Sequence, residues 1–129
     1  MEILNTTKAP AAVGPYVQGI VPTAPGVPVF LSGQIGLIPE SGVLAEGLEQ
    51  QTRQAFKNIE AVLAETGLTL TDVLYANVLL EHIDDFKEVN GYYAEIFGEH
   101  RPTRAAYAAK ALPLGALIEI VVIAWKKLG

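Results

Sequence analysis

Two charged side chains stand in segments that otherwise have the composition of core strands. Arg104 lies in residues 102–107. Glu119 lies in residues 117–123, and all of the remaining residues of that second run are apolar. A buried charge is costly unless it is paired or hydrogen-bonded. Because the planar guanidinium of arginine can bind a carboxylate through two hydrogen bonds, we interpret Arg104 and Glu119 as a site for a small anionic ligand.

An ion pair is the alternative explanation for these two charges. A turn near Pro113 would bring the two strands back alongside each other, so that Arg104 could pair with Glu119 or with another acid. Structural ion pairs also use arginine, and the spacing by itself favours this alternative over ligand binding.

The apolar pattern predicts two helices next to these strands. The first covers about residues 48–65 and ends before Gly67, a C-cap residue. Its inner positions recur at spacings of three and four: Leu48, Thr52, Ala55, Phe56, Ile59, Val62 and Leu63. The second helix is predicted from Asp85 to about Glu99, with Asp84 as its N-cap.

The remaining segments predict a sheet. Strands are expected at about these residues: 16–21, 29–37, 73–80, 103–109 and 116–126, with a short one at 43–45. The order β-β-(β)-α-β-α-β-β indicates the α+β class, with two helices packed on one face of a mixed sheet in one domain spanning residues 1–129.

The last predicted strand is apolar on both of its faces. Two sets of side chains alternate along it, Ile118, Ile120, Val122 and Ala124 against Glu119, Val121, Ile123 and Trp125. The helices can cover only one of these sets. We therefore expect self-assembly to bury the helix-free face, because a large exposed apolar face usually marks association.

Composition narrows the classes of function. Half of the 129 residues are hydrophobic and 18% are charged, which indicates a folded chain with a real core. The net charge of −5 and the lack of a basic block argue against nucleic-acid binding. No run reaches membrane-spanning length and no signal sequence opens the chain, so we expect a cytoplasmic protein without a membrane partner. With no cysteine, thiolate metal sites and thiol nucleophiles are excluded.

Several stretches together resemble the RidA/YjgF/UK114 family. They are PTRAAYAAKAL at residues 102–112 followed by IEI at 118–120, APAAVGPYVQG at 9–19, FLSGQI at 30–35, and FKEVN at 86–90. The resemblance implies a chorismate-mutase-like α+β fold assembled as a homotrimer with clefts between subunits. It implies hydrolysis of reactive enamine and imine intermediates, such as 2-aminoacrylate, 2-iminopropanoate and 2-iminobutanoate, to 2-keto acids and ammonia. No metal or other cofactor is implied.

The resemblance also assigns roles to individual residues. Arg104 would bind the substrate carboxylate and Glu119 would hold the attacking water. Tyr16, Ser32, Gly33 and Asn90 fall where the family lines its cleft, although a bulge would also explain Ser32 and Gly33, and Asn90 could equally support the cleft wall. Many members have a cysteine where this chain has Ala106, whose backbone N–H remains available. We further expect Tyr107 to lie beside the substrate side chain and to tune specificity.

Two other functions compete with the imine deaminase, which would be a cofactor-independent hydrolase. A non-catalytic protein that binds 2-keto acids would use the same arginine. An endoribonuclease or translation inhibitor is a third reading, which the acidic composition disfavours.

Overall fold

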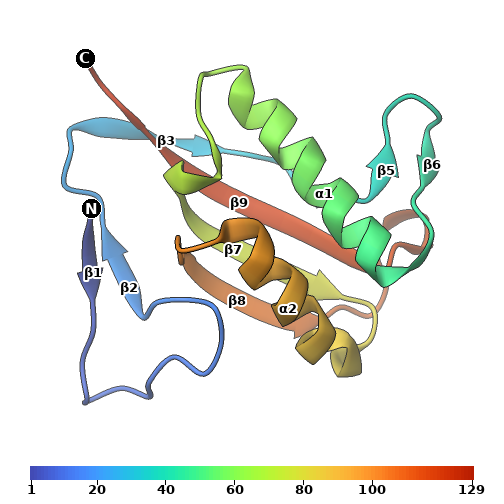
Figure 1. The fold of residues 1–129 in the computed structure, drawn as a ribbon, viewed down its shortest axis with the longest axis horizontal. Coiled ribbons are helices and arrows are strands. Elements are labelled where there is room, and N and C mark those ends of the chain that lie inside the picture. Colours follow the sequence, from blue (N-terminus) through green and yellow to red (C-terminus); the bar gives the residue numbers. More distant parts are fainter.

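The computed structural model describes all 129 residues and shows a mixed sheet with two helices on one face (Figure 1). The main sheet has the order β3-β9-β7-β8, and β4 continues alongside β9 after β3. These strands are β3 (Gly26–Phe30), β4 (Gln34–Ile35), β7 (Val73–Leu80), β8 (Thr103–Ala108) and β9 (Ile118–Lys127). β7 is parallel to β8 and antiparallel to β9, so the predicted mixed sheet of the α+β class is confirmed.

Helix α1 (Gly47–Ala64) follows the predicted apolar pattern except at Val62, which is exposed, whereas Gln51, which was not predicted, is buried. It ends in a Schellman motif, in which the Leu68 N–H donates to the Leu63 carbonyl and the Gly67 N–H donates to the Ala64 carbonyl, both at 3.0 Å. Gly67 has a φ of 75°, which a side chain would disfavour. The predicted C-cap role of Gly67 is therefore confirmed.

Helix α2 (Phe86–Phe97) begins without the predicted cap. A 3₁₀ turn, η2 (Ile83–Asp85), precedes it, and its N-cap residue Asp85 makes no side-chain capping hydrogen bond. Asp84 lies inside that turn, one residue too early to reach the free N–H groups of the helix. The predicted N-cap at Asp84 is therefore wrong.

The predicted strand at residues 29–37 is broken into three pieces, first by a bulge at residues 31–33 and then where the chain leaves the sheet after β4. Phe30 pairs with Ile123 and Gln34 pairs with Ile120, so three residues of one strand, 31–33, face only two of β9. After β4 the chain leaves the sheet and forms a hairpin of β5 (Leu37–Ile38) and β6 (Val43–Leu44). The bulge places Gly33 opposite the middle of β9.

A second small hairpin lies at the edge of the molecule (Figure 1). It pairs β1 (Glu2–Leu4), which the sequence pattern did not indicate, with β2 (Gly19–Val21), the shortened form of the strand predicted at 16–21. Residues 5–18 form the loop between the two strands.

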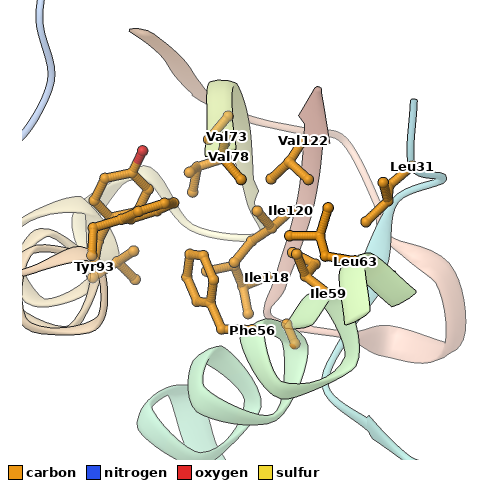
Figure 2. Close-up of a cluster of buried hydrophobic side chains, with 14 of the residues drawn as sticks. Leu31, Phe56, Ile59, Leu63, Val73, Val78, Tyr93, Ile118, Ile120 and Val122 are labelled. Atoms are coloured by element: carbon orange, nitrogen blue, oxygen red, sulfur yellow. The ribbon is translucent and has the colours of Figure 1, made fainter. Parts of the chain in front are cut away.

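The core lies between the helices and one face of the sheet (Figure 2). Every second side chain of β9 enters this core, as predicted, and all four are fully buried: Ile118, Ile120, Val122 and Ala124. Phe56 of α1 meets Tyr93 and Phe97 of α2 edge to face, with ring centroids 5.9 and 5.4 Å apart. Each such buried side chain contributes about 1.5–3 kcal/mol through the area removed from water.

The opposite face of the sheet has no covering element. Val121, Ile123 and Trp125 of β9 are partly exposed there, and Phe30 at the end of β3 is 72% exposed. This helix-free face is apolar and contiguous with Leu79 of β7. Burial of the face by self-assembly stays a prediction.

The predicted pairing of the last two strands is wrong. β7 lies between β8 and β9, and η3 (Pro113–Gly115) connects β8 to β9 across it. β9 is apolar on both faces and takes a central position, whereas β8, which contains Thr103 and Arg104, takes the edge.

Neither helix is long and apolar enough to cross a bilayer.

One prediction concerns the contact between α1 and the strand region beside β4. A Cβ added to the buried Gly36 would lie 2.5 Å from the Cα and carbonyl oxygen of Gln51, which are backbone atoms that cannot rotate away. We expect Gly36→Ala to lower the free energy of unfolding by about 1–3 kcal/mol. Urea denaturation measures it, and Gly91→Ala is the control because nothing lies within 4 Å of that position. Equal midpoints for Gly36→Ala and the wild type would contradict the contact.

Candidate functional site

Arg104 lies on the helix side of the sheet. It is in register with Ala76 of β7, a fully buried core residue, and paired residues on neighbouring strands point to the same face. At this edge of the sheet the guanidinium enters a cage of three aromatic rings. The centroids of Tyr16, Phe86 and Tyr93 lie 5.2, 5.1 and 5.0 Å from its central carbon.

One hydrogen bond fixes the direction of this guanidinium. Arg104 Nη1 donates to Asn90 Oδ1 at 2.6 Å, so the predicted mid-helix Asn90 does contact the predicted Arg104. The ion pairs of the chain involve Arg53 and His82 but not Arg104. Burial lowers the pKa of Arg104, while Tyr93 and Tyr16 partly oppose that shift. Because arginine stays protonated in proteins, the site holds a half-buried positive charge that lacks an acidic partner in the chain.

The loop between β1 and β2 brings Tyr16 to the arginine. The Val17 N–H donates to the Pro102 carbonyl at 3.3 Å, which ties the loop to the residues that enter β8. Gly14 packs directly on the guanidinium, since a Cβ there would lie 3.0 Å from Arg104 Nη2. The predicted Tyr16 therefore belongs to the arginine site, and Gly14 is a contact that the sequence pattern did not single out.

Phe86 and Tyr93 are the other residues that sequence reasoning missed as site residues. Phe86 packs against the core and Tyr93 lies in it, and a periodic apolar pattern does not separate a ring in the core from a ring that holds a cation. Tyr93 is fully buried, and its hydroxyl has no hydrogen-bond partner. Burial raises the pKa of Tyr93, and the nearby charges of Arg104 and Arg101 oppose the rise.

Glu119 lies on the opposite, helix-free face. It is in register with Leu79 of β7 and with Ile35 of β4. Its side chain therefore points to the face opposite that of the buried residues of β9. It is half-buried and forms no ion pair within the chain. Gly33 passes so close that an added Cβ would overlap Glu119 Oε2 and lie 2.9 Å from its Cδ. The bulge therefore places the predicted Gly33 in contact with Glu119. The neighbouring residue, Ser32, is exposed.

Tyr107 belongs to the same face as Glu119. Both residues are in register with Leu79, so they flank it in one row across three strands. The Tyr107 ring is 47% exposed, and its hydroxyl accepts a hydrogen bond of 3.2 Å from Asn77 Nδ2. Ala106 is in register with Val78 and packs against the core, on the side of Arg104.

The predicted residues thus form two half-sites on opposite faces of one sheet. The arginine half-site contains Arg104, Asn90, Tyr16 and Ala106, with Gly14, Phe86 and Tyr93. The glutamate half-site contains Glu119, Gly33 and Tyr107, and no contact joins the predicted Ser32 to it. The chain does not bring Arg104 and Glu119 together, so the alternative of an ion pair between them is wrong. No group of three or more histidine, aspartate or glutamate side chains is arranged to hold a metal ion.

Comparison with known proteins gives the family. The family model described as endoribonuclease L-PSP matches residues 6–126. A RutC family protein of Pyrococcus abyssi is 40% identical over 98% of both chains, and the 2-iminobutanoate/2-iminopropanoate deaminase of Bos taurus is 42% identical over 95% of this chain and 88% of the relative. The crystal structure of E. coli TdcF with bound serine is 33% identical, with a TM-score of 0.74 over 98% of this chain and all of that one. The chain belongs to the RidA/YjgF family, as the motifs indicated.

A prediction follows from the unpartnered hydroxyl of Tyr93. A buried polar atom without a partner costs about 1–3 kcal/mol, so Tyr93→Phe should leave the free energy of unfolding unchanged or raise it by about 1 kcal/mol. Tyr92→Phe is the matched control, because the Tyr92 hydroxyl donates to Glu88 Oε2 at 2.6 Å and its loss should not stabilise the protein. Guanidinium denaturation compares the two. A clear loss of stability in Tyr93→Phe would show that its hydroxyl is satisfied.

Proposed function

We propose that this protein hydrolyses small 2-imino acids, such as 2-iminopropanoate and 2-iminobutanoate, to 2-keto acids and ammonia. The observation that carries the proposal is the guanidinium of Arg104, held by three rings and Asn90 with no acid to neutralise it. A carboxylate is the ligand that such a fork fits best. The deaminase name of the bovine relative and the serine in the TdcF structure, which is also a small carboxylate, agree with this assignment.

The complete site is proposed to lie between protomers of a homotrimer with the chorismate-mutase-like fold. One chain places its arginine half-site and its glutamate half-site on opposite faces of the sheet, so a single cleft needs the first from one protomer and the second from its neighbour. The apolar helix-free face around Glu119 gives the neighbour a surface to cover. A head-to-tail interface of this kind closes into a ring and repeats the same cleft at each junction.

The chemistry needs little more than two placed charges and one water. An iminium acid has a negative carboxylate and a positive nitrogen, and Arg104 and Glu119 contribute one charge of each sign. The occupied cleft is then neutral, which lowers the cost of removing it from solvent. Ala106, which replaces a thiol found in many relatives, offers no nucleophile, so a covalent thiol intermediate is not part of the proposal.

The steps balance with water as the only co-substrate. Arg104 binds the carboxylate and Glu119 accepts a proton from the water whose oxygen adds to the imine carbon. The carbon–nitrogen double bond becomes single, giving a carbinolamine, and Glu119 returns the proton to the nitrogen. The carbon–nitrogen bond then breaks, ammonia takes the hydroxyl proton as it leaves, and the 2-keto acid remains. Positioning the water and the carboxylate accounts for most of the acceleration.

The first test concerns recognition by the guanidinium fork. Arg104→Lys keeps the charge but loses the paired donors, so kcat/KM should fall about 10- to 100-fold. The assay measures 2-keto acid formation when a threonine or serine dehydratase generates the imine. Arg53→Lys is the control, since Arg53 contacts Glu49, Glu95 and the Tyr92 ring and none of the residues around Arg104. If wild-type protein leaves the rate of keto acid formation unchanged, the protein is a binder and not an enzyme.

The second test asks whether two protomers build one cleft. Arg104→Ala and Glu119→Gln proteins should each be nearly inactive, whereas subunits mixed in equal amounts should recover about a quarter of wild-type activity. That share arises because one of the four pairings across a junction unites an intact Arg104 with an intact Glu119. Each variant taken alone through the same unfolding and refolding is the control. A mixture no more active than its parents would mean that one chain supplies both residues.

A further inference from the structure

The loop that brings Tyr16 to Arg104 has little packing of its own. We refer to residues 5–17, between β1 and β2, as the strap (Figure 1). Residues 5–13 are exposed, and the strap contains no helix or strand. A hollow lined by Ile3, Leu4, Ala12 and Val17 separates it from the β1–β2 hairpin. Such a segment opens at low cost unless hydrogen bonds hold it.

The side chain of Gln18 makes three hydrogen bonds to the strap, more than any other side chain there. Its Oε1 accepts from the Thr6 N–H at 2.7 Å, and its Nε2 donates to the carbonyls of Thr6 at 3.1 Å and Pro10 at 2.8 Å. The amide thus pairs with both backbone groups of Thr6, as a neighbouring strand would. These contacts close the loop across twelve positions of sequence.

Two local hydrogen bonds lie within the strap, from the Lys8 N–H to Thr6 Oγ1 at 3.1 Å and from the Tyr16 N–H to the Gly14 carbonyl at 2.8 Å. Two longer hydrogen bonds depend on its closed shape. Val17 reaches the Pro102 carbonyl at 3.3 Å, and the Val13 N–H donates to the Tyr16 hydroxyl at 3.3 Å. The second bond holds the Tyr16 ring across the strap, 5.2 Å from the Arg104 carbon. Gly14, which packs on Arg104 Nη2, lies within the same closed segment.

We propose that Gln18 is a positioning residue, which keeps the strap closed and thereby holds Tyr16 and Gly14 against Arg104. Gln18 acts through those two residues and does not itself touch the guanidinium. The inference rests on the proposed function only in the choice of a small 2-keto acid as the probe ligand. Because the strap supports the carboxylate in the ground state and the transition state alike, its loss weakens binding and raises KM with little change in kcat.

The rate of trypsin cleavage after Lys8 measures how often the strap opens. Lys8 is the only lysine or arginine in residues 1–52, and it lies between Thr6 and Pro10, the two residues that Gln18 holds. Cleavage after Lys8 requires local opening, so its rate follows the population of the open strap. Loss of three hydrogen bonds in Gln18→Ala should raise that rate about tenfold or more. Gln50→Ala, a change at an exposed glutamine in the first turn of α1, should not alter it.

The variant Gln18→Glu separates hydrogen bonding from side-chain shape. It keeps an oxygen for the Thr6 N–H but loses both donors and places a carboxylate against two carbonyls. Cleavage after Lys8 should therefore be at least as fast as in Gln18→Ala. Cleavage at the wild-type rate in both variants would overturn the proposal, because the strap would then be held by something else.

Calorimetry with 2-oxobutanoate tests the link from the strap to Arg104. Both Gln18 variants should bind it about tenfold more weakly than the wild type and Gln50→Ala, with kcat within about twofold where turnover is measurable. Fast cleavage after Lys8 with unchanged affinity would overturn the positioning role. If the wild type binds 2-oxobutanoate but does not hydrolyse imines, the proposed enzyme function fails while cleavage and affinity still decide the role of Gln18. A wild type that does not bind 2-oxobutanoate overturns both.

Discussion

The positive charge of Arg104 has no carboxylate partner in its own chain, and the arrangement of the site depends on that constraint. Three aromatic rings and one amide oxygen surround the guanidinium without neutralising it. Quadrupole attraction from the rings offsets part of the cost of removing the charge from water. The half-buried fork is thus left with capacity for a carboxylate from outside the chain, and the proposed function rests on that capacity.

The sheet keeps the two charged groups apart within one protomer. Side chains alternate between the faces of a strand, and β7 fixes the register of both neighbours. Arg104 is in register with Ala76 and points to the helices, whereas Glu119 is in register with Leu79 and points away from them. Association would therefore serve two purposes in this fold, covering apolar strands and supplying the missing half of a cleft.

Two glycines allow the backbone to approach the charged groups closely. Gly14 in the strap lies against the guanidinium, and Gly33 in the bulge lies against the carboxylate of Glu119. Neither position requires a left-handed backbone. Their role is space, because a methyl group at either position would meet a functional side chain. The strap and the bulge are irregular segments, and each places backbone beside a residue of a regular strand.

Features that depend on local spacing could be predicted from the sequence. Helix α1, strand β7 and the alternating burial of β9 follow from periodic apolar residues, and the family motifs pointed to Arg104, Glu119, Asn90 and Gly33. Three features became known only from the folded structure: β7 separates β8 from β9, Phe86 and Tyr93 contact the guanidinium, and Gln18 binds the backbone of the strap. Strand order and side-chain contacts between distant segments depend on the total burial that each pairing achieves across the whole chain. A short run of residues contains no information about that total, and so the division of the site between two faces could not be read from spacing alone.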